Sequence, residues 1–98
     1  MKSLQDKIVV VTGASRGLGL ELARTFAAEG CRVAMAARDQ RTLTDAAKKI
    51  ADSGGQTLPF ACDVTRREEV HELAQRMMTI WGSAQILINN AGIARAMR

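Results

Sequence analysis

The chain has 98 residues, 47% of them hydrophobic and 24% charged, a composition typical of one small globular domain or of a piece of a larger one. The net charge of +4 comes without a dense Lys/Arg run and with only 3% aromatic residues, so nucleic acid is not an expected partner. The apolar run at residues 8–11 is far too short for a signal peptide or a membrane span, which predicts a cytoplasmic protein with no membrane partner.

The first half of the chain predicts two strands and two helices in alternation. The β-branched run at residues 7–12 is typical of a parallel strand buried on both faces, and residues 17–29 follow it with a helical pattern. The apolar residues of this helix recur at four-residue steps: Leu18, Leu22 and Phe26. Arg32–Ala37 predicts a second, weaker strand. Asp39 is placed to cap a second helix, which ends at Gly54-Gly55.

The second half of the chain continues this alternation. Residues 57–62 predict a third strand, and Pro59 within it favours an edge position, because proline cannot donate to a strand ladder. The pattern TRRE at residues 65–68 is typical of a capping box that opens a third helix. Apolar residues three and four apart give this helix one stripe: Val70, Leu73, Met77 and Trp81. Residues 85–89 predict a fourth strand.

The order β-α-β-α-β-α-β predicts an α/β fold with a parallel sheet of strand order 3-2-1-4, since each connection is long enough for a right-handed crossover. The sequence stops soon after the fourth strand, which would leave an apolar sheet edge exposed and favour self-association. Cys31 and Cys62 fall at opposite ends of neighbouring strands, beyond disulfide reach, so free buried thiols are expected.

Three glycines, Gly13, Gly17 and Gly19, lie in the stretch TGASRGLG between the first strand and the first helix. A turn of this kind presents free backbone N–H groups at a helix N-terminus, and with the helix dipole they favour an anion such as a pyrophosphate. Ser15 adds a hydroxyl donor. The spacing is not that of a P-loop, since no lysine follows the last glycine. A glycine-rich turn without a ligand is the alternative interpretation.

Three motifs together resemble the short-chain dehydrogenase/reductase family. They are TGASRGLG at residues 12–19, Asp63-Val64 after the third strand, and NNAG at residues 89–92 after the fourth. The resemblance extends over residues 7–93 and keeps the motifs in the family's order. It implies a Rossmann-type fold, truncated here after the fourth strand, so that residues 1–98 form a partial NAD(P)-binding domain.

The resemblance also implies a role for each motif position. Those of the first turn would line the pyrophosphate and the adjacent ribose: Gly13, Ser15, Arg16, Gly17, Leu18 and Gly19. Asp63 and Val64 would lie against the adenine, with the carboxylate accepting a hydrogen bond from the exocyclic amine. The residues after the fourth strand would border the ribose and the path to the nicotinamide: Asn90, Ala91 and Gly92. Asn89 is expected to tie the fourth strand to the turn.

The end of the second strand is expected to select the cofactor, because it lies beside the adenosine ribose. In members of the family that prefer NAD, an acidic residue usually stands at the position that aligns with Ala37. Members that use NADP resemble this chain, with basic residues at the positions of Arg38 and Arg16. Two guanidinium groups would bind the 2′-phosphate through charge-assisted hydrogen bonds. We therefore expect NADP rather than NAD. The rival is Asp39, which would serve the ribose 2′-hydroxyl if the second strand ended one or two residues later, but we expect Asp39 to cap the second helix instead.

The resemblance implies an oxidoreductase for an alcohol or carbonyl substrate, which uses a Tyr, a Lys four residues later, a Ser and an Asn, all downstream of the NNAG turn. The sequence contains no tyrosine, so we assign no catalytic residue and expect the chain alone to be inactive. No spacing of metal ligands is recognisable. The complete enzyme is expected to be a homo-oligomer. The alternative function is a non-catalytic dinucleotide-binding or interaction module.

Overall fold

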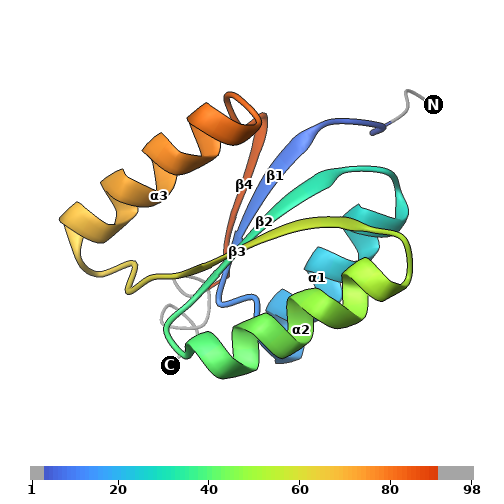
Figure 1. Cartoon of the computed structure of the whole chain (residues 1–98), viewed down its shortest axis with the longest axis horizontal. Helices are drawn as coiled ribbons and strands as arrows, with labels where there is room; N and C mark the ends of the chain where they lie inside the picture. Colours follow the sequence, from blue (N-terminus) through green and yellow to red (C-terminus); the bar gives the residue numbers. More distant parts are fainter. Residues whose placement is uncertain (1–3, 91–98) are drawn as a thin grey trace.

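Strands and helices alternate through residues 4–90, the part of the chain that the computed structural model describes (Figure 1). In chain order they are β1 (Ile8–Thr12), α1 (Gly17–Ala28), β2 (Arg32–Ala37), α2 (Gln40–Asp52), β3 (Gln56–Ala61), α3 (Arg67–Ile80) and β4 (Ile86–Asn89). The strands pair in parallel in the order β3-β2-β1-β4, which confirms the predicted α/β fold and strand order. Within these residues no helix combines the length and the apolar character needed to cross a membrane.

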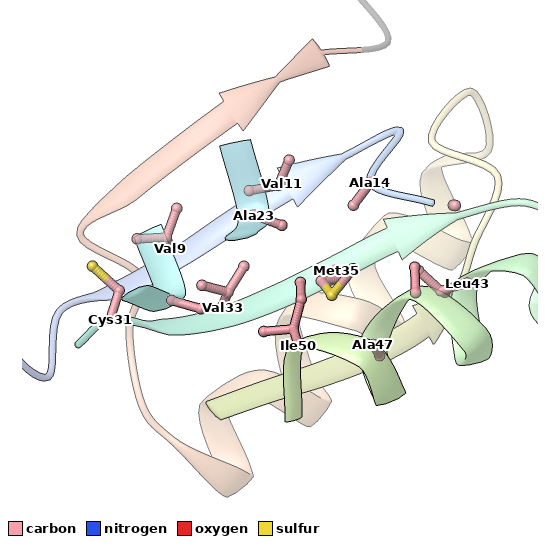
Figure 2. Close-up of a cluster of buried hydrophobic side chains, with 13 residues drawn as sticks. Val9, Val11, Ala14, Ala23, Cys31, Val33, Met35, Leu43, Ala47 and Ile50 are labelled. Carbon is pink, nitrogen blue, oxygen red and sulfur yellow. The ribbon is translucent and has the colours of Figure 1, made fainter. Parts of the chain in front are cut away.

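Helices cover both faces of the sheet, with α1 and α2 on one side and α3 on the other (Figure 1). Because successive strand residues point to opposite faces, β1 gives Val9 and Val11 to one core and Ile8 and Val10 to the other. Figure 2 shows the first core, to which α2 contributes Leu43, Ala46, Ala47 and Ile50. Every residue of β1 is buried, which explains why residues 8–11 are apolar and β-branched; the strand ends in the buried, β-branched Thr12.

The buried face of α1 is not the one that the large apolar residues predict. Its buried positions are the small residues Gly19, Ala23 and Ala27. Leu18 is 58% exposed, and the other two large residues of the predicted stripe are half-buried. Small side chains allow the helix backbone to lie close to β1 and β2, so the small residues of this helix, and not its large ones, face the sheet.

The sequence predicts side-chain caps at the starts of both α2 and α3, and only the first is confirmed. Asp39 Oδ1 accepts hydrogen bonds from the backbone N–H groups of Arg41 at 3.0 Å and Thr42 at 3.2 Å. The prediction of a capping box at residues 65–68 is wrong, because α3 begins after Arg66 and no side chain among the described residues caps it. Thr65 Oγ1 instead donates to Asp63 Oδ1 at 2.6 Å, so the preceding carboxylate takes the hydroxyl that would have capped the helix.

β3 and β4 are the two edges of the described sheet. Pro59 lies in β3, opposite Met35 of β2, so its predicted edge position is confirmed. Among residues 4–90, β4 pairs with β1 alone, and its Leu87 side chain is 66% exposed. An apolar side chain therefore lies uncovered beside a strand edge in this part of the chain.

Cys31 and Cys62 are both free and buried, as expected. Burial raises the pKa of both thiols, because a thiolate loses hydration in apolar surroundings. Cys31 Sγ also donates to the carbonyl oxygen of Leu4 at 3.4 Å. Both cysteines are therefore packing residues and not nucleophiles.

Candidate functional site

The carboxyl ends of the four strands lie together at one edge of the sheet. In the register of the ladder, Thr12 at the end of β1 is aligned with Ala36 of β2 and with Asn89 of β4. Ala37 at the end of β2 is aligned with Ala61 at the end of β3. The residues that follow these ends include most of the predicted site positions. In open parallel sheets this edge is where ligands bind.

The turn between β1 and α1, residues 13–16, has the backbone geometry that its glycines suggest. Gly13 has φ +63° and Gly17 has φ +60°, a region that favours glycine. The N–H of Ala14, a fully buried residue, donates to the carbonyl oxygen of Ala36 at 3.1 Å, which fastens the turn to β2. The turn is therefore held on the sheet while residues 15–17 remain accessible to a ligand.

Gly19 and Gly17 differ in the space around the position where a side chain would begin. A Cβ on Gly19 would collide with the carbonyl group of Gly13, whose carbon would lie 2.7 Å away, and with Asn90 Nδ2 at 2.9 Å. A Cβ on Gly17 would meet no described atom within 4 Å. The helix thus packs tightly on the turn at Gly19, and the space over Gly17 is open for a group to approach the backbone.

No side chain among residues 4–90 caps the N-terminus of α1, so its first backbone N–H groups are available as donors. Its N-cap residue, Arg16, is extended with φ −164° and makes no side-chain cap hydrogen bond, and the first turn contains no acidic residue. The positive end of the helix dipole is therefore not neutralised by the described residues. Ser15 is half-buried in the same turn, where its hydroxyl can join the backbone N–H groups as a donor.

Two asparagines attach β4 to the β1–α1 connection. Asn90 Nδ2 donates to the carbonyl oxygen of Gly13 at 3.3 Å. Thr12 Oγ1 lies 3.2 Å from Asn89 Oδ1 and 3.4 Å from the carbonyl oxygen of Ile88. Asn90, which the sequence suggests only as a ligand contact, thus also braces the glycine turn. Ala91 and Gly92 lie outside the described residues.

The side chain of Asp63 is held by hydrogen bonds within the loop that follows β3. Its Oδ1 accepts from the N–H of Thr65 at 3.0 Å and from the Thr65 hydroxyl. These hydrogen bonds, with smaller contributions from the positive charges of Arg38 and Arg66, lower the pKa of the Asp63 carboxyl. Asp63 is therefore an ionised hydrogen-bond acceptor at neutral pH. Val64 beside it packs against the core on the α3 side.

Arg38 and Asp39 follow β2 and have different surroundings. Arg38 is exposed at the carboxyl edge of the sheet, close enough to Asp63 for its charge to act on that carboxylate. Asp39 is occupied as the cap of α2, and the backbone hydrogen bond from Thr42 is the main reason why its pKa is lowered. Oδ1 of Asp39 is thus committed to the helix cap, whereas the basic side chain of Arg38 is exposed at the edge, where it suits an anionic ligand.

Other ionisable groups are not gathered into a site. Among residues 4–90, no group of three or more His, Cys, Asp or Glu side chains is arranged to hold a metal ion. His71 is exposed on α3. What the described residues bring together at this edge is a set of backbone N–H groups and guanidinium side chains, which suits an anion.

Residues 7–98 match a family model described as short chain dehydrogenase. An uncharacterized oxidoreductase of Staphylococcus saprophyticus is 42% identical over 94 residues, which make up 95% of this chain and 40% of that protein. The chain therefore spans less than half the length of this relative.

Solved structures share the fold. L-sorbose reductase from Gluconobacter frateurii, complexed with NADPH and L-sorbose, has a TM-score of 0.86 at 35% identity, over 90% of this chain and 34% of that one. A short chain dehydrogenase/reductase from Burkholderia phymatum, in complex with NAD, has a TM-score of 0.84 at 25% identity, over 89% of this chain and 31% of that one. The two structures hold different nicotinamide cofactors.

Proposed function

Because the chain belongs to the short-chain dehydrogenase family, we propose that it forms the coenzyme-binding part of an NADP(H)-dependent oxidoreductase for an alcohol or carbonyl substrate. The observation that carries this proposal is the β1–α1 turn. Its glycines have positive φ and lead into a helix N-terminus without a side-chain cap, with open space over Gly17. Backbone N–H groups in this arrangement suit a diphosphate.

Each part of the coenzyme has residues suited to it. The diphosphate and adjacent ribose would meet the first turn of α1 and the residues before it: Gly13, Ser15, Arg16, Gly17, Leu18 and Gly19. Asp63 would accept a hydrogen bond from the adenine amine, with Val64 against the ring. Asn90, followed by Ala91 and Gly92, would border the nicotinamide ribose. When bound, the nicotinamide supplies or accepts the hydride.

The preference for NADP rests on Arg38 and Arg16. Both are exposed at the carboxyl edge of the sheet, and two guanidinium groups suit a 2′-phosphate that carries close to two negative charges. The residue that would favour NAD, Asp39, is engaged in capping α2. The solved relatives include complexes with each coenzyme, so the proposal depends on these side chains and not on the likeness.

A fluorescence titration with NADPH and NADH tests the proposal. Arg38→Asp is expected to weaken NADPH binding by about tenfold or more, because charge-assisted hydrogen bonds to the phosphate are lost, and to leave NADH binding nearly unchanged. Arg24→Asp is the matched control, since Arg24 lies on α1 and pairs only loosely with Glu21 at 3.6 Å. Equal losses for both coenzymes would reject the NADP assignment, and no binding of either coenzyme by the unsubstituted chain would reject the function.

A non-catalytic dinucleotide-binding module is the second candidate, because a glycine turn at a helix N-terminus can hold a diphosphate whether or not hydride transfer follows. The two functions differ in whether hydride transfer accompanies binding. Oxidation of NADPH with a carbonyl compound by the natural full-length product would exclude the non-catalytic module. In either case the two free thiols fit the reducing cytoplasm, where we place this function.

A further inference from the structure

The loop between β3 and α3, residues 62–66, is closed by a compact set of hydrogen bonds around Asp63 (Figure 1 shows its course). The carbonyl oxygen of Asp63 accepts from the N–H of Arg66 at 3.0 Å. Its Oδ1 accepts from Thr65 twice. Asp63 Oδ2 accepts no hydrogen bond from residues 4–90, so it remains available to a ligand.

Glu69 supplies the remaining contact of this loop from the first turn of α3. Its Oε1 accepts from the N–H of Asp63 at 2.9 Å, and its Oε2 lies 3.2 Å from Arg66 Nε. One carboxylate thus joins Asp63 to the residue that immediately precedes α3. The Glu69 side chain is 38% exposed, whereas that of Arg66 is 63% exposed, so the carboxylate lies partly within the loop.

Asp63 is therefore anchored in the loop from both sides. Val64 packs against the core on the α3 side, and the polar anchor is the hydrogen bond from Asp63 N–H to Glu69. Without an acceptor at position 69, the N–H of the Cys62–Asp63 peptide would lose its partner, and the loop's own hydrogen bonds from Thr65 and Arg66 would be all that holds Asp63 beside the packing of Val64. A change in the orientation of this peptide would change the direction of Asp63 Oδ2.

We propose that Glu69 is a positioning residue, which aims the Asp63 carboxylate at the exocyclic amine of the adenine by holding the Asp63 N–H. The inference rests on the proposed function, because it requires that the adenine lies at this loop. Glu69 itself does not touch the coenzyme. Its effect is on one contact, that between Asp63 and the amine, and not on the diphosphate turn.

The test compares NADPH with its deamino analogue, in which hypoxanthine replaces adenine and the exocyclic amine is missing. The ratio of the two dissociation constants reports on the purine edge that faces Asp63, which has an amine donor in NADPH and a carbonyl acceptor in the analogue, and a general loss of stability does not change it. We expect the unsubstituted chain to prefer NADPH. Glu69→Ala is expected to lower that preference by up to about tenfold, toward a ratio of one.

Three further variants complete the design. Glu69→Asp retains the negative charge of the first turn of α3 but shortens the side chain, so it should lose the preference without loss of the helix. Glu69→Gln retains an oxygen acceptor and should restore the preference. Glu68→Ala is the matched control, because Glu68 is an exposed acid in the same turn, and it should leave the ratio unchanged.

The outcomes separate this inference from the proposed function. A chain that binds NADPH with a preference over the deamino analogue, and keeps it in both Glu69→Ala and Glu69→Asp, would overturn the role of Glu69 alone. Equal weakening of both coenzymes in these variants would also overturn it, since that result marks a purely structural residue. If the unsubstituted chain binds neither coenzyme, the proposed function fails and the inference fails with it.

Discussion

Asn90 Nδ2 donates a hydrogen bond to the carbonyl oxygen of Gly13, 77 positions earlier in the chain. The bond joins the end of β4 to the turn that we propose as the diphosphate site. A residue suggested by its motif as a ligand contact is thus also part of the support of the turn. The shape of the anion site depends on the attachment of an edge strand, and this dependence can be measured.

Replacing Asn90 with Ala is expected to lower the free energy of unfolding by about 1 kcal/mol, because the Gly13 carbonyl loses its donor. It is also expected to weaken NADPH binding, since the turn is no longer braced. Urea denaturation and a fluorescence titration measure the two effects. Gln75→Ala, which removes an exposed amide from α3, is the control and should change neither quantity. Wild-type stability and affinity in Asn90→Ala would refute the bracing role.

Gly19→Ala tests the close packing of α1 on the turn. Alanine favours a helix by about 1 kcal/mol over glycine, so helix propensity alone predicts stabilisation. The added Cβ would instead collide with the backbone of Gly13, so we expect destabilisation by about 2 kcal/mol.

Gly54→Ala is the matched control for this substitution. Gly54 has φ +95°, and a methyl group added there would meet no described atom within 4 Å, so only backbone strain of about 1 kcal/mol is expected. Urea denaturation of both variants gives the comparison. A Gly19→Ala variant as stable as the parent chain would show that α1 does not pack on the turn in this way.

The cap at Asp39 makes stability depend on pH in the acid range. Its pKa is lowered below the ordinary value of 3.8 in the folded chain, chiefly by the backbone hydrogen bond from Thr42. The folded state therefore binds this proton less readily than the unfolded state, so the stabilisation is complete above the ordinary value and is lost as the pH falls through the lowered one.

Asp39→Ser keeps a capping oxygen that does not titrate in this range. As the pH falls from about 6 to about 3, the unfolding free energy of the parent chain is expected to decrease relative to that of Asp39→Ser. Chemical denaturation across this range measures it. A difference that does not change with pH would contradict the capping role of the ionised carboxylate.

The exposed edge at β4 predicts concentration-dependent self-association of the chain. Leu87→Lys is expected to reduce association, since a lysine on an edge strand disfavours pairing with another strand. Sedimentation velocity at several concentrations measures the effect. Ile80→Lys, at a 53% exposed position on α3, separates the strand edge from general surface apolarity. If only Ile80→Lys reduces association, the contact lies on α3 and the prediction for β4 is wrong.

The alternation of strands and helices can be predicted from the sequence because hydrophobic pattern and turn residues agree in each segment. The β-branched run before Gly13 marks a fully buried strand, and the glycines after it mark the turn. The crossover rule is independent of side-chain detail and limits the parallel sheet to a few strand orders, of which 3-2-1-4 is the one observed. Pro59 of β3 predicts an edge strand because proline has no backbone N–H to donate to a second neighbouring strand.

The errors arise where two groups compete for one position. Periodicity of large side chains assigns Leu18 to the buried face of α1, but backbone approach at Gly19 takes precedence. The capping pattern assigns Thr65 to α3, but its hydroxyl bonds Asp63. In the sequence, Glu69 is one acid among several on a polar helix face. Its contact with Asp63 is missed because it depends on where α3 begins. Local patterns do not rank such competing partners.

The order of strands in the sheet has a consequence for synthesis. β1 lies between β2 and β4, so it acquires its second neighbour only when the fourth of the described strands has been made. On the ribosome, β1, β2 and β3 emerge and pair while one side of β1 is still unprotected. A nascent chain halted before β4 would therefore offer a bare, apolar strand to chaperones.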